Sequence, residues 1–360
     1  MAYTTIDNSE LHFQTKTYTG NGSTNAITLD GSENMQPDWV WIKDRGRTGY
    51  NHVLNDSVRG VTKYIRSNLN NSEATLSDAI TSFDSNGFTL GSDSSNGEHN
   101  VNSQTYVAWN WKAGGSASSN SNGSITSSVS VSTDAGFSIV SYTGNATSGA
   151  TLGHGLGVKP AMIISKNRDE AQNWFCYHKS LGATDYIRLN LTNASGSATS
   201  IWNDTEPTTS VFSVGNDTAT NGSSDKIVAF CFAEVKGYSK FGKYTGNGNA
   251  DGTFVYTGFK PAWVMIKRTD SGNGWFITDN KRLGFNSSTT NSATLGNVEL
   301  AAHDSRSEAA GNTNMMDLLS NGFKCRQSGT DSNTSGGTYI YMAFAESPFT
   351  NSNSVPNNAR

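Results

Sequence analysis

Two acid–base pairs at corresponding points of the chain are the first residues that could do chemistry. Asp56 precedes Arg59 and Asp279 precedes Arg282, each at a spacing of three. A carboxylate held in this way can act as a general acid or base. The corresponding stretch between them carries His178 and has no matching arginine. We therefore interpret both pairs as structural, each tying down a loop through a charge-assisted hydrogen bond.

The histidines and cysteines are the possible metal ligands. His154 and His178 have no second histidine or cysteine nearby at ligand spacing, and Cys176, Cys231 and Cys325 lie far apart. A zinc site needs several such groups together. We predict surface or hydrogen-bonded core histidines, buried free thiols, and neither a metal nor a cofactor.

Eight tryptophans provide the remaining candidates. Those inside apolar segments are predicted to be core residues: Trp39, Trp41, Trp109, Trp111 and Trp263. Trp174, Trp202 and Trp275 lie near loops, where a ring can stack on a sugar or fill a protein contact. These three are the candidate ligand-binding residues, although packing in the core is the favoured alternative for them.

Motifs of catalysis give little support to an enzyme. The chain has no Gly-x-Ser-x-Gly elbow, no phosphate-binding loop and no His-Glu-x-x-His motif. Paired carboxylates for sugar hydrolysis can be brought together from distant loops, so hydrolysis stays an alternative. We predict that the protein is not an enzyme.

The segments that must position these residues occur in three copies. Tyr-Thr-Gly-Asn begins at Tyr18, Tyr142 and Tyr244. Two further phrases recur in the same order, starting at Pro37, Pro160 and Pro261 and covering 106–111, 227–232 and 339–344. Each copy has about 100 residues, which is the size of a domain and far longer than a solenoid repeat. We predict three units with separate cores in an elongated rod.

The local pattern predicts strands joined by turns. Short segments rich in Val, Ile, Trp, Tyr and Phe alternate with clusters of Gly, Asn, Asp and Ser. Residues 39–42 and 263–266 are apolar at odd and even positions, as in a strand covered on both faces or at a domain contact. Only 72–80 and 314–319 are candidates for short helices. The predicted fold class is all-β, with three tandem antiparallel β-sandwich or jelly-roll-like domains.

Domain boundaries follow from the repeated phrases and from composition. We predict an N-terminal arm (1–10), three repeats (11–113, 135–236 and 237–348), a Gly/Ser/Asn-rich linker (114–134) and an extended C-terminal tail (349–360). The linker is flexible by composition. In contrast, 234–238 is a tight junction that should fix the second repeat against the third.

Composition narrows the classes of partner. Charged residues make up 16% of the chain, against about a quarter in typical globular proteins, and the net charge is −4. No basic stripe is present for phosphate contacts, so nucleic acid is not an expected partner. No segment has the length of apolar sequence that a membrane span needs, and the first residues do not resemble a cleaved signal.

Three stretches of the first repeat carry a resemblance to a known family. Residues 54–64, 82–91 and 106–115 are similar to the repeat phrases of virion-associated proteins of tailed, especially marine, bacteriophages, often labelled tail fibre or tail protein. The resemblance continues through all three repeats. It implies a structural component of the virion, assembled in the host cytoplasm, whose partners are other tail or capsid proteins and a glycan or protein of the host surface. Analogy with such parts also implies a homo-oligomer, most often a trimer.

The resemblance leaves three functions open. A tail fibre or tail appendage that contributes to host attachment is the preferred one. A capsid decoration or head-fibre protein without a host ligand is the alternative, and a host-glycan depolymerase is the second alternative.

Overall fold

The chain folds almost entirely into antiparallel sheets. The structure is a computed structural model that describes residues 4–282, 299–308, 315–351, 353 and 355. Strands make up 42% and helices 4%, which confirms the prediction of a mostly β protein. The helices are short: η1 (Ser9–Leu11), α1 (Thr199–Trp202) and α2 (Thr218–Asn221). None of the helices among the described residues is long and apolar enough to cross a membrane.

The first repeat consists of a large sheet and a small one. The strands of the large sheet are, in spatial order, β1 (Phe13–Thr19), β9 (Thr105–Trp111), β3 (Trp39–Asp44), β4 (His52–Asp56), β5 (Lys63–Arg66) and β6 (Ala74–Thr75). The strands of the small sheet are β2 (Asn25–Thr28), β8 (Gly87–Leu90) and β7 (Ile80–Asp84).

The second repeat has the same two parts. Its large sheet has the order β10 (Ser118–Asn120), β11 (Ser127–Ser132), β12 (Phe137–Thr143), β19 (Lys226–Phe232), β14 (Met162–Asn167), β15 (Phe175–His178), β16 (Asp185–Arg188) and β17 (Gly196–Ser197). Its small sheet pairs β13 (Ala150–Gly153) with β18 (Val211–Val214).

The third repeat completes the series. Its large sheet has the order β20 (Ser239–Thr245), β27 (Thr338–Pro348), β22 (Phe259–Arg268), β23 (Trp275–Asp279) and β24 (Leu300–Ala301). Its small sheet has the order β21 (Phe254–Tyr256), β26 (Gly322–Cys325) and β25 (Met316–Leu319). The two predicted helices are therefore absent, because 72–80 contains β6 and 314–319 contains β25, with residue 314 outside the described residues.

Strands that are apolar at every position serve two cores at once. Trp39 and Trp41 of β3 face a cluster shared by all three repeats, whereas Val40 and Ile42 face the cluster between the two sheets of the first repeat. Because side chains of a strand alternate between its faces, a strand buried on both faces needs apolar residues at odd and even positions. The prediction for 39–42 is confirmed, and β22 follows the same rule.

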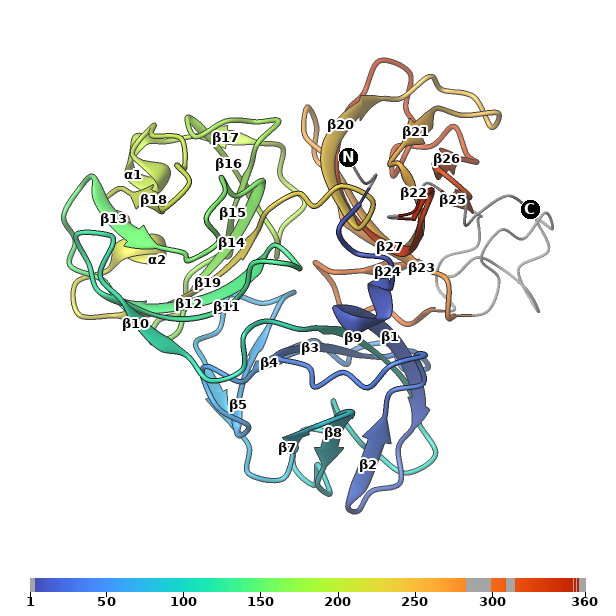
Figure 1. Cartoon of the computed structure of the whole chain (residues 1–360), viewed down its shortest axis with the longest axis horizontal. Coiled ribbons are helices and arrows are strands. Elements are labelled where there is room, and N and C mark those ends of the chain that lie inside the picture. Colours follow the sequence, from blue (N-terminus) through green and yellow to red (C-terminus); the bar gives the residue numbers. More distant parts are fainter. Residues whose placement is uncertain (1–3, 283–298, 309–314, 352, 354, 356–360) are drawn as a thin grey trace.

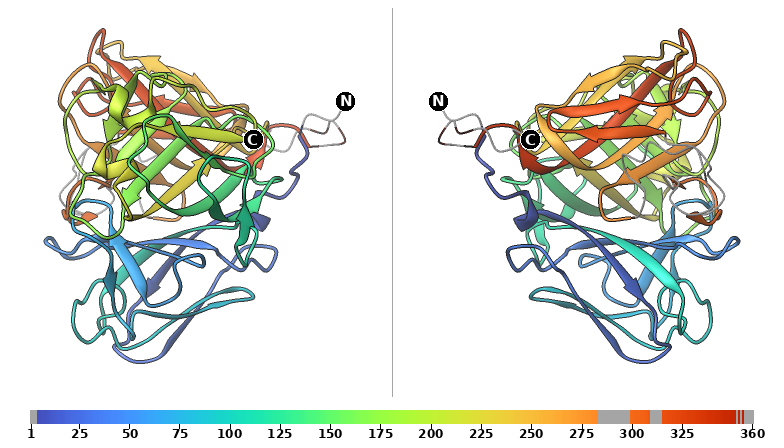
Figure 2. Two further views of the ribbon diagram at one scale, coloured as in Figure 1. Left: turned by 90° about the vertical axis from the view of Figure 1, so that its left-hand side faces the viewer. Right: turned by 90° about the vertical axis from the view of Figure 1, so that its right-hand side faces the viewer.

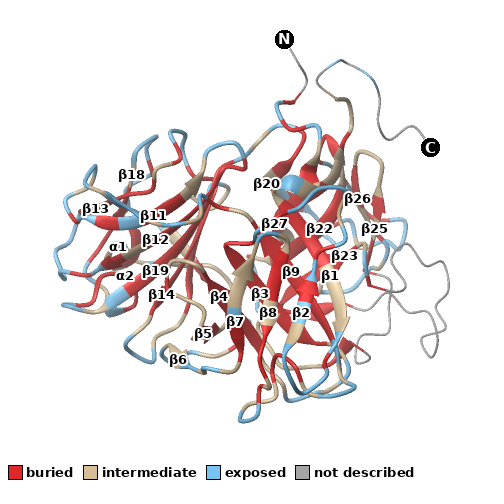
Figure 3. Cartoon of the chain, turned by 60° about the horizontal axis from the view of Figure 1, so that its bottom comes forward, coloured by how far each residue is buried: buried red, intermediate tan, exposed pale blue. Residues whose placement is uncertain are grey.

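The shared cluster, which we call the central core, contains the inward faces of all three large sheets. Its rings meet across each boundary between repeats: Trp39 with Phe230 (centroids 4.5 Å apart), Trp111 with Trp263 (5.5 Å) and Phe232 with Phe344 (6.0 Å). Figure 1 shows the three repeats around this common centre, Figure 2 shows them in contact from two further sides, and in Figure 3 the strands facing the centre are coloured as buried. The predicted separate cores are present as one further cluster in each repeat, but the prediction of an elongated rod is wrong.

One backbone hydrogen bond recurs at each of the three boundaries and closes the arrangement. The N–H of Glu73 donates to the carbonyl of Arg168 (2.7 Å), that of Ser195 to Thr269 (2.9 Å), and that of Glu308 to Arg45 (2.8 Å). The first bond joins repeat 1 to repeat 2, the second joins repeat 2 to repeat 3, and the third returns to repeat 1. The three repeats therefore form an approximate threefold ring within a single chain.

The predicted linker is part of a sheet. Within 114–134, β11 pairs with β12 over five residues and β10 pairs with β11. Ser127, Val129 and Ser130 of β11 are buried, whereas Ser128 faces solvent. Low complexity is typical of a flexible segment, but this one gains backbone hydrogen bonds and buried side chains by pairing with β12. The prediction of a flexible linker is corrected accordingly.

Both ends of the chain contact the third repeat where they are described. Ile6 of the predicted arm belongs to the central core and is 4% exposed. The N–H of Phe349, the first residue of the predicted tail, donates to the carbonyl of Gly258 (3.4 Å). Residues 1–3 of the arm and 352, 354 and 356–360 of the tail lie outside the described residues.

The phrase Tyr-Thr-Gly-Asn forms a structural clamp at the ends of β1, β12 and β20. In the second repeat the Tyr142 hydroxyl donates to the carbonyl of Thr220 (2.6 Å), and the N–H of Asn145 donates to Oδ1 of Asn221 (2.9 Å). Gly144 lies so close to this loop that a Cβ would stand 2.2 Å from the carbonyl oxygen of Gly222. The corresponding bonds recur in the other repeats, with Asn100 and Asn333 in the place of Asn221.

Asn221→Ala should lower the free energy of unfolding by about 1–3 kcal/mol, because it leaves buried backbone groups without partners. The side-chain amide also donates to the carbonyls of Thr147 (2.9 Å) and Gly215 (2.7 Å). Chemical denaturation measures the loss. Asn122→Ala, at an exposed position of the same protein, is the control and should change stability by less than about 0.5 kcal/mol. Equal effects of the two variants would contradict the clamp.

Candidate functional site

The two acid–base pairs lie buried at boundaries between repeats. Asp56 forms an ion pair with Arg59, and Asp279 forms one with Arg282 (2.6 Å). Each aspartate also accepts the backbone N–H of its arginine (2.8 Å and 3.1 Å), and each guanidinium reaches back to a strand carbonyl. These contacts close the loop after β4 and after β23, as the sequence predicted for a structural pair.

Each pair extends into the neighbouring repeat through a glutamate. Arg59 contacts Glu73 (3.1 Å), which forms an ion pair with Arg168 of the second repeat (2.9 Å). The arginine partners lower the pKa of Glu73, although burial opposes them. Sequence reasoning missed Glu73 and Arg168, because their contact joins loops that are 95 positions apart.

The same network joins the third repeat to the first. Arg282 contacts Glu308 (3.1 Å), and Glu308 forms an ion pair with Arg45 (2.7 Å). The indole N–H of Trp109 donates to Asp279 (2.9 Å), so this aspartate also anchors the central core.

The boundary between the second and third repeats uses backbone carbonyls in place of ion pairs. Ser195 and Thr269 stand where the other boundaries have Glu and Arg, and Leu181 stands three positions after His178, where the other repeats have an arginine. Lys267 donates to the carbonyls of Thr192 (3.1 Å) and Asn193 (2.9 Å) across this boundary. The missing arginine therefore accompanies the loss of the glutamate that it would contact.

A buried lysine occupies the same strand position in every repeat. Lys43, Lys166 and Lys267 are each 0% exposed. Burial lowers the pKa of Lys43 to about 8 and that of Lys166 and Lys267 to about 7. All three ammonium groups donate to backbone carbonyls, with Lys43 bound to Asp44 (2.8 Å). Complete burial separates these amines from any external substrate, so we interpret them as structural.

The three candidate ligand-binding tryptophans are buried. Trp174, Trp202 and Trp275 are 0%, 2% and 1% exposed. The indole N–H of Trp174 donates to the backbone carbonyl of Arg66 in the preceding repeat (2.9 Å), and that of Trp275 donates to the carbonyl of Arg188 (2.8 Å). Trp202 packs in the core between the sheets of the second repeat. None of these three rings presents a face to solvent, which leaves the alternative of core packing.

Three histidines are buried in a defined neutral form. Nδ1 of His178 accepts the N–H of Ser180 (3.1 Å), so its Nε2 carries the proton that faces the carbonyl of Tyr341 (3.2 Å). His154 is held in the same way by Leu156, and Nδ1 of His52 accepts the indole N–H of Trp41 (2.9 Å). Burial lowers the pKa of His154 and of His178 to about 4 and that of His52 well below its ordinary value. These are hydrogen-bonded core histidines.

Acidification should destabilise the protein below about pH 6.5, the pKa of a histidine in an unfolded chain. Between this pH and about 4 the unfolded chain binds protons that folded His154 and His178 refuse, so stability is full above 6.5 and is lost as the pH falls. His178 alone should contribute up to about 1.4 kcal/mol per pH unit. Denaturation at several pH values tests this, and His178→Gln should show the shallower dependence. Parallel pH profiles would contradict the assignment.

The remaining ionisable groups form no metal site that the described residues reveal. Cys176, Cys231 and Cys325 are buried free thiols, as predicted. Burial raises the pKa of each thiol, that of Cys325 to about 11. Within the described part of the chain, no group of three or more His, Cys, Asp or Glu side chains could hold a metal ion.

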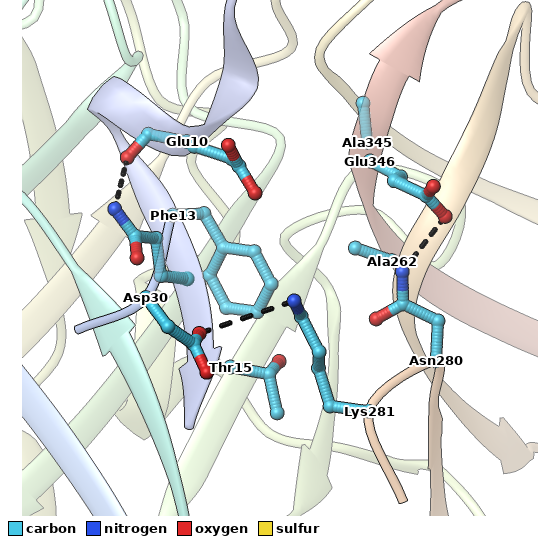
Figure 4. Close-up of a pocket in the computed structure, with 10 residues that line it drawn as sticks. Glu10, Phe13, Thr15, Asp30, Ala262, Asn280, Lys281, Ala345 and Glu346 are labelled. Carbon is cyan, nitrogen blue, oxygen red and sulfur yellow. Dashed lines mark hydrogen bonds and ion pairs between the residues drawn. The ribbon is translucent and has the colours of Figure 1, made fainter. Parts of the chain in front are cut away.

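A shallow cleft between the first and third repeats gathers several carboxylates (Figure 4). Glu10 accepts the N–H of Ser32 (2.7 Å), and Glu346 accepts Nδ2 of Asn280 (2.7 Å). Asp30 lies 3.9 Å from Nζ of Lys281 on the opposite wall. The cleft has a volume of about 80 Å³, far below the roughly 300–1,000 Å³ of ligand pockets. Each carboxylate is already engaged by a donor of the protein, and the space is too small for a sugar chain.

These features define a single-chain, threefold-repeated β protein with buried ion pairs at two of its three boundaries. A family model described as a domain of unknown function (DUF7483) matches residues 8–348, and the chain belongs to this family. The match runs across all three repeats. No curated protein and no solved structure matches the chain.

Proposed function

We propose that this protein is a non-enzymatic structural component of a tailed-phage virion, and that it serves as a tail fibre or tail appendage contributing to host attachment. The observation that carries the proposal is the central core. All three repeats share it, and buried ion pairs join two of the three boundaries. The repeats therefore form one stiff body, which suits a part that transmits or resists force. The resemblance of 54–64, 82–91 and 106–115 to phage virion proteins supports the same function.

We also propose that each repeat is a β-sandwich unit of jelly-roll character. Each one has a large inner sheet, a small outer sheet and an apolar cluster between the two. The partners are proposed to be tail or capsid proteins and a glycan or protein of the host surface.

The homotrimer stays a prediction by analogy. Threefold packing of repeats already exists within one chain, so the repeats need no further copies to enclose the central core. Native mass spectrometry of the purified protein measures the number of chains. A trimer would contain three chains, each with its own ring of three repeats. A monomer would contradict the analogy with trimeric virion parts.

Labelling of intact virions with an antibody to this protein tests the proposed location, together with binding of the purified chain to host cells. Label at the tail and saturable cell binding are expected. Label over the head without cell binding would overturn attachment in favour of capsid decoration. Release of reducing ends from purified host glycan would overturn the non-enzymatic function in favour of a depolymerase.

A further inference from the structure

In the second repeat, one segment runs along the neighbouring edges of the large and the small sheet and bonds to both. Residues 124–132 run past both: β11 pairs with β12 of the large sheet, and the N–H of Ile125 donates to the carbonyl of Thr151 in β13 of the small sheet (3.1 Å). The Ser127 hydroxyl donates to the carbonyl of Gly153 (3.0 Å). This segment, which we call the closing strand, covers two edges at once.

The registers of the small sheets identify the same place in the third repeat. Leu152 of β13 pairs with Phe212, and Val255 of β21 pairs with Phe323. Phe254 and Tyr256 therefore correspond to Thr151 and Gly153, the residues whose carbonyls bind the closing strand. Likewise β20 corresponds to β12, and among the described residues it is the terminal strand of its sheet (Figure 1).

This side of the third repeat exposes aromatic rings beside a groove. Phe254 and Tyr256 are 45% and 49% exposed, although Val255 between them is buried. A groove of about 360 Å³ lies between β20 and the end of β21, lined in part by Ser239, Lys240 and Tyr256. Nζ of Lys240 lies 5.7 Å from the centroid of the Tyr256 ring.

The first repeat protects its corresponding edge with its own side chains. Gln14 of β1 accepts the N–H of Gly31 (2.9 Å), and Lys16 forms an ion pair with Asp30 (3.1 Å). In the third repeat, Gly242 stands at the position of Lys16. The Tyr341 ring of β27 fills the place of its missing side chain, because a Cβ there would stand 2.7 Å from the Tyr341 hydroxyl. The three repeats thus treat one edge in three ways, with a closing strand, with polar side chains, and with a groove flanked by aromatic rings.

We propose that the β20 edge of the third repeat binds an extended segment of a partner protein, which pairs antiparallel to β20 and packs apolar side chains on Phe254 and Tyr256. The closing strand defines the chemistry of this segment: it is uncharged and alternates small polar with β-branched residues, as in Ser-Ser-Val-Ser-Val-Ser. Edge strands accept such segments through main-chain hydrogen bonds, and alternate side chains supply specificity. The inference does not depend on where the protein lies in a virion.

A peptide with the sequence of residues 123–133 is the probe. Labelled with a fluorophore and titrated with the full chain, it should bind saturably at one site. The double variant Phe254→Ser/Tyr256→Ser should weaken binding by about tenfold or more, because the apolar contact area is lost. Val158→Ser, which removes another apolar side chain of 49% exposure, should leave binding unchanged. Thermal unfolding of both variants should match that of the parent protein, since the replaced side chains are half exposed.

Backbone methylation distinguishes strand pairing from adsorption on the rings. Successive N–H groups of a strand point to opposite sides, so N-methylation of 128, 130 and 132 or of 127, 129 and 131 should abolish binding in one case only. Equal binding of both methylated peptides, or unchanged binding to the double variant, would overturn the proposal. If the chain self-associates and the double variant does not, the β20 edge binds a second copy of this chain. That result would overturn the proposal of a different partner protein.

Discussion

Trp39→Ala is expected to lower the free energy of unfolding of the whole chain by about 3–5 kcal/mol. Trp39 is 0% exposed and lies in the central core, 4.5 Å from both Phe230 of the second repeat and Trp111 of the first (centroid distances). Alanine would leave a cavity that borders two repeats. Chemical denaturation followed by tryptophan fluorescence and by far-UV circular dichroism measures the loss, and we expect the two signals to change together.

Trp202→Ala is the matched control for that experiment. Trp202 is also buried, but it packs inside the second repeat alone. Hydrogen exchange should show weakened protection in all three repeats for Trp39→Ala and chiefly in the second repeat for Trp202→Ala. Weakened protection confined to the first repeat in Trp39→Ala would mean that the repeats unfold independently, contrary to a shared core.

Asp279→Ala should cost about 3–5 kcal/mol, because it leaves a buried guanidinium without its closest carboxylate. Asp279 accepts hydrogen bonds from Nε of Arg282 (2.6 Å), Nε1 of Trp109 (2.9 Å) and the N–H of Lys281 (3.1 Å). Denaturant titration gives the change in stability. Asp30→Ala is the control: its ion pair with Lys16 is at the surface, where the aspartate side chain is 55% exposed, and its loss should cost less than about 1 kcal/mol.

A second substitution tests whether the orphaned charge causes the loss. Asp279→Ala/Arg282→Met removes both members of the pair. The free energy of unfolding that it loses should be smaller than the sum of the losses in Asp279→Ala and Arg282→Met. Additive losses would show that the pair is not coupled. Because Glu308 retains its contact with Arg45, the boundary keeps one ion pair in the double variant.

The two experiments also bear on the proposed function. If each substitution weakens only the repeat that contains it, the protein is a set of linked units and not one stiff body. If each substitution weakens all repeats together, three copies of one unit act as a single mechanical part. That result would support a structural role.

Much of the local structure could be predicted from the sequence. Repeated phrases revealed three copies, and clusters of Gly, Asn and Ser between apolar segments predicted strands and turns. The pairs Asp56 with Arg59 and Asp279 with Arg282 were predicted because residues three positions apart across a turn can meet without knowledge of the fold. The burial of Trp39, Trp41 and the three cysteines followed from apolar neighbours.

Contacts between repeats could not be predicted in the same way. An apolar stretch such as 39–42 indicates burial on both faces, but it does not say whether a second sheet or another repeat covers the outer face. The sequence favours a rod because each copy is long enough to fold alone. The composition of 114–134 predicts flexibility because it describes the free segment and ignores the edge of β12, with which the segment pairs.

The mostly β class, the three repeats and the local pairs can be predicted from the sequence, since these depend on side-chain alternation and on residues close in the chain. The fold is needed to see that the repeats enclose one central core, that Glu73 and Glu308 extend the ion pairs into the next repeat, and that Trp174, Trp202 and Trp275 are covered. The fold also shows that one edge is closed in the second repeat and lined by exposed rings in the third. Burial and edge pairing depend on which surfaces from distant parts of the chain meet. The local pattern of one repeat does not show which surface of another repeat covers it.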